Sequence, residues 1–282
     1  MNILISNDDG IFAPGIKKLA RLLSKIKDAE IYVCAPDRER SCVGHGLTLF
    51  DDLRLRDQPA EEYGPAVVWA KGCSGTPGDC VRLALSVLGM KGIKIDLVCA
   101  GINNGGNTGS DINYSGTLAA CREAVIDGFP AIAFSSTRGL DYLDNFDLIV
   151  PEICSRFIGK IPENTVLNVN APNIPWSEIK GYRDASLEQL RYPPRYTLVD
   201  RTGEDETPPE DTETFAFASF AMEIVNAAED ADTVLVKDGW VTVSLIPLLQ
   251  DIGETKAFTE RMLSGAEDDP EKKDYPNSLF LV

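Results

Sequence analysis

Short apolar runs alternate with segments of helical periodicity through the first 170 residues. The pattern predicts strands at residues 2–6, 31–35, 67–70, 96–102, 131–135 and 166–169, and helices at 16–26, 79–88, 117–126 and 143–158. Continuous apolar strands that alternate with helices indicate a parallel sheet covered on both faces. We therefore expect a three-layer, doubly wound α/β fold of the Rossmann-like kind, with a mostly parallel sheet.

The pattern changes after about residue 180. An aromatic, proline-containing stretch at 191–196 precedes an acidic segment at 204–213, and residues 215–220 and 239–245 alternate like strands. We interpret the acidic segment as a solvated loop rather than a metal site. The predicted organisation is an α/β core at 1–180, an extended β-rich appendage with a return segment at 181–264, and a charged tail at 265–282.

Charge and composition exclude several classes of partner. The 282 residues include 27 Lys and Arg against 44 Asp and Glu, a net charge of −17, and such a field repels long nucleic acid. No apolar run approaches the roughly 20 residues of a membrane span, and an apolar strand rather than a signal peptide follows Met1. We expect a cytoplasmic protein. Seven cysteines without CxxC spacing are expected to be reduced and buried, and a single histidine argues against zinc.

Polar loops follow the predicted strands at 7–10, 37–46, 72–79 and 103–117. In open α/β sheets, ligands bind beyond the carboxyl ends of the strands. All four loops lie at that edge or reach it, so we expect them to meet at one crevice.

Asp8 and Asp9 are the first candidates for chemistry. Together with Gly10 they favour a turn when taken alone. However, two adjacent carboxylates at the end of a buried strand are costly unless a cation neutralises them. Oxygen ligands suit Mg²⁺, Mn²⁺ or Ca²⁺. The pair is therefore a candidate metal site.

Two further loops carry candidate ligands. Ser41 is a possible hydroxyl ligand, or an ordinary helix cap, and His45 is a candidate general acid or a hydrogen-bonded structural residue. A glycine-rich stretch at 101–110 lets the backbone approach a ligand. Within it, Asn103 suits a metal and Asn107 suits a phosphate.

Two helix starts have the same construction, one at Ser74-Gly75-Thr76 and one at Ser115-Gly116-Thr117. Ser and Thr are good N-caps, and the free N–H groups of a helix start also bind phosphate oxygens. Because Ser115, Gly116 and Thr117 follow the glycine-rich stretch, we favour the phosphate role for them. Thr76 is a candidate for either role.

Several of these motifs together resemble the SurE family of stationary-phase survival proteins, which are 5'-nucleotidases. The matching stretches are ILISNDDG (3–10), APDRERSCVGHGLT (35–48), SGTPGDCVRLA (74–84), AGINNGGNTGSDINYSGT (100–117) and LNVNAP (167–172). They span the first 172 residues in order. The match is looser towards the C-terminus.

The resemblance implies a set of site residues and partners. One divalent ion per subunit, Mg²⁺ or Mn²⁺, would be held by Asp8, Asp9, Ser41 and Asn103. Asn107 and the turn at 115–117 would lie near the phosphate. The resemblance also implies a homodimer or homotetramer in which the C-terminal β segment reaches onto a neighbouring subunit.

The expected activity is metal-dependent hydrolysis of nucleoside monophosphates to nucleoside and phosphate, with 3'-nucleotides and short polyphosphate as further candidate substrates. Asp8 and Asp9 are the candidate catalytic residues, as metal ligands or as base or nucleophile. Two alternatives remain. One is an aspartyl-phosphate phosphatase, although that class presents DxD where this chain has Gly10 two positions after Asp8. The other is a non-catalytic sensor of nucleotides or anions.

Overall fold

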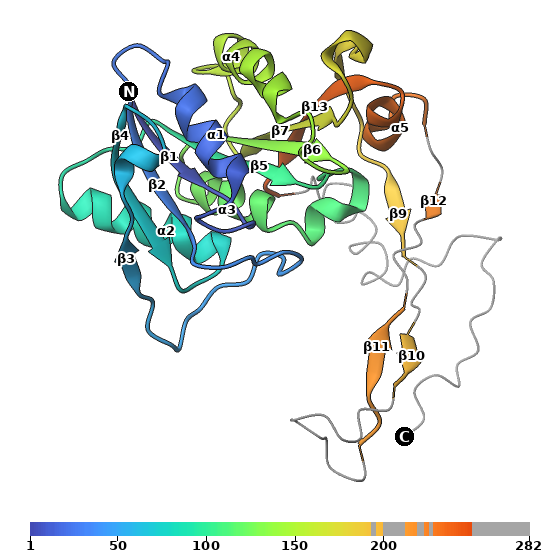
Figure 1. The fold of residues 1–282 in the computed structure, drawn as a ribbon, viewed down its shortest axis with the longest axis horizontal. Coiled ribbons are helices and arrows are strands. Elements are labelled where there is room, and N and C mark those ends of the chain that lie inside the picture. Colours follow the sequence, from blue (N-terminus) through green and yellow to red (C-terminus); the bar gives the residue numbers. More distant parts are fainter. Residues whose placement is uncertain (193–195, 200–211, 219–222, 226–227, 250–282) are drawn as a thin grey trace, which may run out of the picture. The chain divides into compact units, whose positions relative to one another are not determined.

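A nine-stranded sheet forms the centre of this computed structural model, in the order β3-β4-β2-β1-β5-β6-β7-β13-β8 (Figure 1). The structure describes residues 1–192, 196–199, 212–218, 223–225 and 228–249. Most of the acidic segment and the whole tail at 265–282 lie outside these ranges. Met1–Leu248 form one compact unit.

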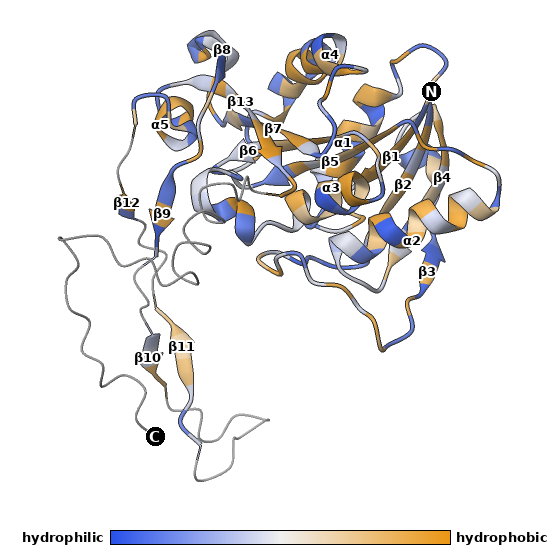
Figure 2. Ribbon diagram, turned by 180° about the vertical axis from the view of Figure 1, so that it is seen from behind, coloured by the Kyte–Doolittle hydropathy of each residue, from blue (hydrophilic) through white to orange (hydrophobic). Residues whose placement is uncertain are grey.

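Six neighbouring strands of the sheet are parallel, and they confirm the predicted doubly wound pattern. They are β4 (Val67–Cys73), β2 (Glu30–Pro36), β1 (Asn2–Ser6), β5 (Leu97–Asn104), β6 (Ala131–Thr137) and β7 (Thr165–Pro172). Each overlaps a strand predicted from its apolar run, and the strand predicted at 96–102 begins one residue before β5. In Figure 2 the inner strands are predominantly hydrophobic in colour, as expected of strands buried on both faces.

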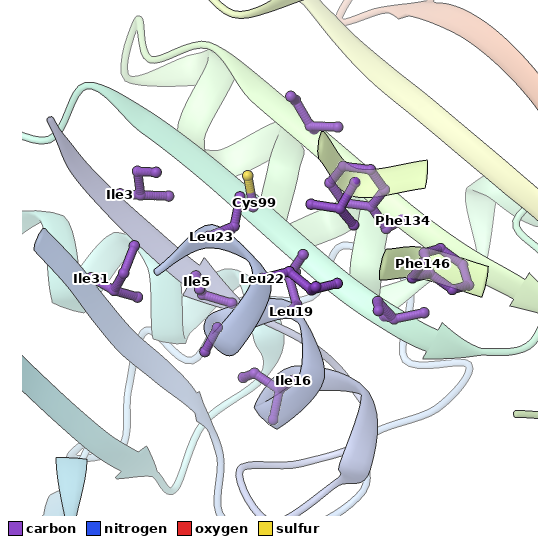
Figure 3. Close-up of a cluster of buried hydrophobic side chains, with 14 of the residues drawn as sticks. Ile3, Ile5, Ile16, Leu19, Leu22, Leu23, Ile31, Cys99, Phe134 and Phe146 are labelled. Carbon is purple, nitrogen blue, oxygen red and sulfur yellow. The ribbon is translucent and has the colours of Figure 1, made fainter. Parts of the chain in front are cut away.

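Helices cover both faces of the sheet. α1 (Pro14–Leu23) and α4 (Phe146–Phe157) pack on one face, and α2 (Pro77–Met90) and α3 (Gly116–Ile126) on the other. Successive side chains of β1 point to opposite faces of the sheet. Ile3 and Ile5 pack with α1 in the cluster of Figure 3, whereas Leu4 packs on the other face with α2 and α3. The three layers predicted from the sequence are therefore present.

Local sequence explains where the site-bearing helices begin. α2 starts at a capping box, in which the Thr76 hydroxyl accepts from the Asp79 N–H and the Asp79 carboxylate accepts from the Thr76 N–H. α1 starts with Pro14 at its first turn. The next residue is Gly15, and only glycine fits there, because a Cβ would lie 1.9 Å from the carbonyl oxygen of Ile102.

The C-terminal part adds strands to the same sheet. β13 (Trp240–Pro247) pairs antiparallel with β7, and β8 (Gly181–Asp184) pairs parallel with β13. The short helix α5 (Asp232–Lys237) precedes β13. The strand expected at 239–245 is thus part of the main sheet, while the division of the chain at residue 180 stays a prediction.

Smaller elements complete the described chain. β3 (Leu55–Asp57) is the antiparallel edge strand, and two separate ribbons pair β9 (Gln189–Arg191) with β12 (Glu223–Val225) and β10 (Tyr196–Leu198) with β11 (Phe215–Phe217). Single 3₁₀ turns are η1 (Ala60–Glu62), η2 (Gly109–Asn113), η3 (Leu143–Asn145) and η4 (Trp176–Glu178). β11 lies within the predicted strand at 215–220, and η3 forms the first turn of the helix predicted at 143–158.

Six of the seven free cysteines are buried, as expected, and Cys42 is exposed. Within the described ranges, no helix combines the length and apolar character needed to cross a membrane.

Candidate functional site

A cavity of about 620 Å³ opens at the carboxyl edge of the sheet. Its walls come from the end of β1, the loop after β2, the end of β5 with the glycine-rich stretch, the start of α3, and the segment around β9 to β11. Five of the predicted site residues line it: Asp8, Ser41, Asn103, Asn107 and Ser115. The expected meeting of loops at one crevice is therefore observed for three of the four loops.

Asp8 is the most enclosed carboxylate of the cavity. Only 4% of the residue is exposed, and the Thr117 hydroxyl donates to its Oδ1. A Cβ on Gly116 would lie 2.6 Å from the Asp8 Cβ, so the start of α3 packs directly on this side chain. On the other side, the Arg40 N–H donates to the Asp8 carbonyl at 2.7 Å. Gly116 and Thr117 therefore reach the site through Asp8 rather than by lining the cavity.

The pKa of Asp8 is raised to about 6, mainly by burial and also by the neighbouring charge of Asp9, against the lowering effect of the Thr117 hydroxyl. Asp9 is half-buried, and its Oδ2 accepts from the Asn104 N–H at 3.0 Å. Burial raises the pKa of Asp9 as well. The neighbouring charges are Asp9 for Asp8 and Glu39 for Asp9, and this concentration of carboxylates favours a cation beside the pair.

Ser41 and Asn103 add neutral oxygens to this pair. The Ser41 Oγ donates to Glu39 Oε1 at 2.8 Å, and the Asn103 Nδ2 donates to the Gly105 carbonyl at 2.9 Å, which leaves Oδ1 as the remaining polar atom of the amide. Among the described residues, no group of three or more His, Cys, Asp or Glu could hold a metal ion. Two carboxylates with hydroxyl and amide oxygens instead fit a hard cation that keeps positions for water and substrate oxygens.

Asn107 anchors the glycine-rich stretch. Its N–H donates to Asn170 Oδ1 at 2.7 Å, its Nδ2 donates to Ser135 Oγ at 2.8 Å, and its carbonyl accepts from the side chains of Asn168 and Asn170. These partners come from β6 and β7. The network fixes the loop while Gly105 and Gly106 present backbone to the cavity.

A second anchor comes from the far end of the chain. The Gly109 N–H lies 3.1 and 3.0 Å from the two carboxylate oxygens of Asp232, the first residue of α5. Asp232 is fully buried, and burial raises its pKa to about 6. Gly109 has φ +49°, and a Cβ there would lie 2.7 Å from the carbonyl oxygen of Glu188. The sequence interpretation missed Asp232, although an acidic residue before an apolar helical stretch is a recognisable helix-start signal.

Ser115 has the capping role weighed from the sequence, while its phosphate role stays a prediction. Its Oγ accepts from the Leu118 N–H at 3.0 Å, which caps α3, and the residue also lines the cavity. The N-terminus of α3, with its partial positive charge, thus lies at the cavity wall.

His45 and Thr76 are placed elsewhere. His45 Nε2 lies 2.8 Å from Glu123 Oε1, and Arg82 reaches the other oxygen of Glu123 at 3.3 Å. Thr76 caps α2, and its hydroxyl donates to the Gly46 carbonyl at 2.7 Å. Neither His45 nor Thr76 lines the cavity, and a chemical role for either stays a prediction.

The rest of the cavity wall is aromatic, which the sequence interpretation missed. Tyr114, Tyr192, Tyr196 and Phe217 line it together with Asp111. Three of these aromatic residues come from the region after residue 180, where the sequence predicted a β-rich appendage and no site residue. The available signal was the concentration of tyrosine at 192–196.

The comparisons with known proteins agree with this geometry. The family model described as "Survival protein SurE" matches residues 3–193. A protein named 5'-nucleotidase SurE from Carboxydothermus hydrogenoformans is 44% identical over 197 residues, 68% of this chain and 72% of the relative. Another of that name, from Synechococcus sp., is 37% identical over 263 residues, 92% of this chain and 95% of the relative.

A solved structure shares the fold. The crystal structure of the SurE protein from Aquifex aeolicus has a TM-score of 0.72 and 31% sequence identity, and the match covers 92% of this chain and all of that chain. The family match spans well over half of the chain, and the relatives are similar over most of their length. The chain therefore belongs to the SurE family.

Proposed function

We propose that this protein is a metal-dependent 5'-nucleotidase that hydrolyses nucleoside monophosphates to nucleoside and phosphate. The observation that carries the proposal is the lining of the cavity, which combines Asp8, Ser41 and Asn103 with the backbone at Gly105 and Gly106 and with the start of α3 at Ser115. Oxygen atoms suited to a cation and N–H groups suited to phosphate oxygens thus line the same cavity. As a member of a family of enzymes named for this activity, the chain is a phosphoric monoester hydrolase.

The proposed cofactor is one Mg²⁺ or Mn²⁺ per subunit. The residues that would hold it are Asp8, Asp9, Ser41 and Asn103, and the adjacency of a buried and a half-buried carboxylate, both with raised pKa values, supports this donor set. When bound, such an ion neutralises charge on the phosphoryl group and activates a water molecule.

The chain's own groups have separate tasks in this reaction. The Thr117 hydroxyl keeps Asp8 in its charged form, and the Asn104 N–H holds Asp9. The backbone at Gly105 and Gly106 and the N-terminus of α3 at Ser115 supply positive potential for the phosphoryl oxygens. Asp8 and Asp9 both stay candidates for accepting a proton from the attacking water.

We also propose that the protein assembles as a homodimer or homotetramer through its C-terminal segment. The ribbon of β10 and β11 exposes large apolar side chains, with Leu198 64% and Phe215 56% exposed. A two-stranded ribbon is marginally stable without packing partners, so a second copy is a suitable cover for this pair. Light scattering coupled to gel filtration measures the assembly, and a monomer at micromolar concentration would contradict the proposal.

Phosphate release from a panel of 5'-nucleotides, 3'-nucleotides and short polyphosphate, measured with Mg²⁺, Mn²⁺ or EDTA, tests the activity and its metal dependence together. Asp8→Asn and Asp9→Asn are expected to abolish metal-dependent release. Asp127→Asn, at the exposed C-terminal end of α3, is the matched control and is expected to keep it. Full metal-dependent activity in folded Asp8→Asn and Asp9→Asn variants would sink the assignment, and tight nucleotide binding without release would favour a sensor.

A further inference from the structure

The cavity that contains the proposed phosphate site is also lined by aromatic side chains, among them Tyr196 and Phe217. The chemistry proposed above gives these side chains no role. We propose that this part of the lining is the nucleoside subsite: Asp111 accepts a hydrogen bond from the ribose hydroxyls, and Tyr196 and Phe217 provide aromatic contact for the base. This inference rests on the proposed nucleotidase function. It adds the residues that recognise the nucleoside, which is the leaving group of the proposed reaction.

The volume of the cavity requires more than a phosphate. At about 620 Å³, it falls within the range of roughly 300–1,000 Å³ typical of pockets that enclose whole small-molecule ligands. The lining of this cavity combines Asp8 and Asn103 with Tyr192, Tyr196 and Phe217. A ligand that fills it therefore carries an anionic group and a larger part that suits an aromatic surface.

Asp111 is a prepared acceptor for a sugar hydroxyl. It lies on η2, between the glycine-rich stretch and α3, and the Tyr192 hydroxyl donates to its Oδ2 at 2.7 Å. Tyr192 thereby orients the carboxylate, whose other oxygen, Oδ1, suits a hydroxyl donor in the cavity. The segment that carries Tyr192 is itself fixed to the same loop. Leu190, two residues before Tyr192, donates its N–H to Ser110 Oγ at 2.9 Å. Tyr192 is thus a positioning residue for Asp111.

Tyr196 and Phe217 form the aromatic pair. They are direct partners across the β10–β11 ribbon, and their ring centroids lie 5.6 Å apart at 77° in an edge-to-face arrangement. Both line the cavity, and both are exposed to solvent, Tyr196 at 61% and Phe217 at 43%. Aromatic surface of this kind contacts the face of any nucleobase, because every base has one.

This arrangement predicts a particular specificity. The aromatic pair offers a surface without a hydrogen-bonding code, so the four common bases are expected to be accepted within about tenfold of one another. Sugar phosphates that lack a base, and nucleotides that lack the ribose hydroxyls, lose contacts that the complete nucleotide makes. Comparing these substrates with the complete nucleotide on the wild-type enzyme therefore tests the subsite without any variant.

The first experiment compares kcat/KM for AMP, 2'-deoxy-AMP, 3'-deoxy-AMP and ribose 5-phosphate with Mg²⁺ or Mn²⁺. We expect ribose 5-phosphate to be at least tenfold poorer than AMP, and at least one deoxynucleotide to be about tenfold poorer. Equal values for all four would overturn the subsite while leaving the nucleotidase proposal intact. Failure to hydrolyse any of them with metal would overturn the nucleotidase proposal itself.

The second experiment assigns the effect to residues. Phe217→Ala and Tyr196→Ala are expected to lower the ratio of kcat/KM for AMP to that for ribose 5-phosphate by about tenfold each. Asp111→Asn and Tyr192→Phe are expected to lower the ratio for AMP to that for the affected deoxynucleotide, with the larger loss for Asp111→Asn. Phe50→Ala is the matched control, because Phe50 is 99% exposed and lies outside the cavity lining.

Each variant is checked by its melting temperature and by light scattering, so that a ratio is interpreted only for folded protein of unchanged assembly. An unchanged ratio in folded Phe217→Ala and Tyr196→Ala variants would remove the base contact from the proposal. An unchanged ratio in Asp111→Asn would remove the ribose contact. If these variants do not fold, the wild-type comparison of substrates still decides the proposal.

Discussion

The hydroxyl of Thr117 is the only side-chain donor that the structure gives to the Asp8 carboxylate among the described residues, and Thr117→Val removes it while keeping the shape of the side chain. Thr117 is fully buried. We expect the variant to fold and to need more metal for activity, because the carboxylate that would hold the metal loses the group that favours its charged form.

The magnitude follows from the kind of bond lost. A hydrogen bond to a charged group contributes about 1.5–3 kcal/mol, which corresponds to about a 10-fold to 150-fold change in an equilibrium that requires ionised Asp8. The pKa of Asp8, about 6 in the native enzyme, is expected to rise in the variant. The deficit in metal affinity is therefore larger at pH 6 than at pH 8, where protonation of Asp8 competes less with the metal.

The assay is phosphate release from AMP as a function of Mg²⁺ or Mn²⁺ concentration at pH 6, 7 and 8. Thr117→Ser, which keeps a hydroxyl, is the control and is expected to stay close to the native requirement. The reasoning is refuted if folded Thr117→Val reaches half-maximal activity at the native metal concentration at every pH.

Three further changes test other parts of the fold. Gly15→Ala places a Cβ 1.9 Å from the Ile102 carbonyl oxygen, so we expect a loss of at least about 3 kcal/mol of unfolding free energy in urea titrations; native stability would contradict the close packing of α1 on β5. Thr76→Ala removes the cap of α2 and is expected to cost about 1 kcal/mol in the same titration, with kcat unchanged. Asp232 has its pKa raised to about 6, above its value of about 4 in the unfolded chain. The ionised form therefore costs stability, and native unfolding free energy falls by about 3 kcal/mol as pH rises from about 4 to 6. Asp232→Asn is expected to lose that component of the pH dependence, and identical pH profiles for the two proteins would show that the pKa of Asp232 is the same in the folded and unfolded states.

Much of the fold was predictable because its signals are local. The apolar run of β1, the polar loop at Asp8 and the periodicity of α1 follow one another within 23 residues, so no distant information is needed. The same holds for the caps of α2 and α3. Parallel strands then bring their carboxyl ends to one edge by rule, which is why Asp8, Ser41 and Asn103 were placed at one cavity.

What the sequence did not predict depends on partners far along the chain. Asp232 lies 123 residues from Gly109, and Tyr192 lies 81 residues from Asp111. Nothing in the local pattern around Asp232 or Tyr192 points to those partners. Conversely, Ser115 carried two plausible roles, and only the structure shows that capping and lining the cavity are compatible.

The anchoring of the glycine-rich stretch by Asp232 has a consequence for synthesis. The chain leaves the ribosome from its N-terminus, so the loop at 105–109 emerges long before α5 and β13, which follow it by more than 120 residues. Until those residues appear, Gly109 lacks its carboxylate partner and β7 lacks its antiparallel neighbour. A nascent fragment that ends near residue 180 can therefore hold all the proposed metal ligands and still have an unfinished cavity. Completion of the cavity therefore waits until the partners of Gly109 and β7 have been made.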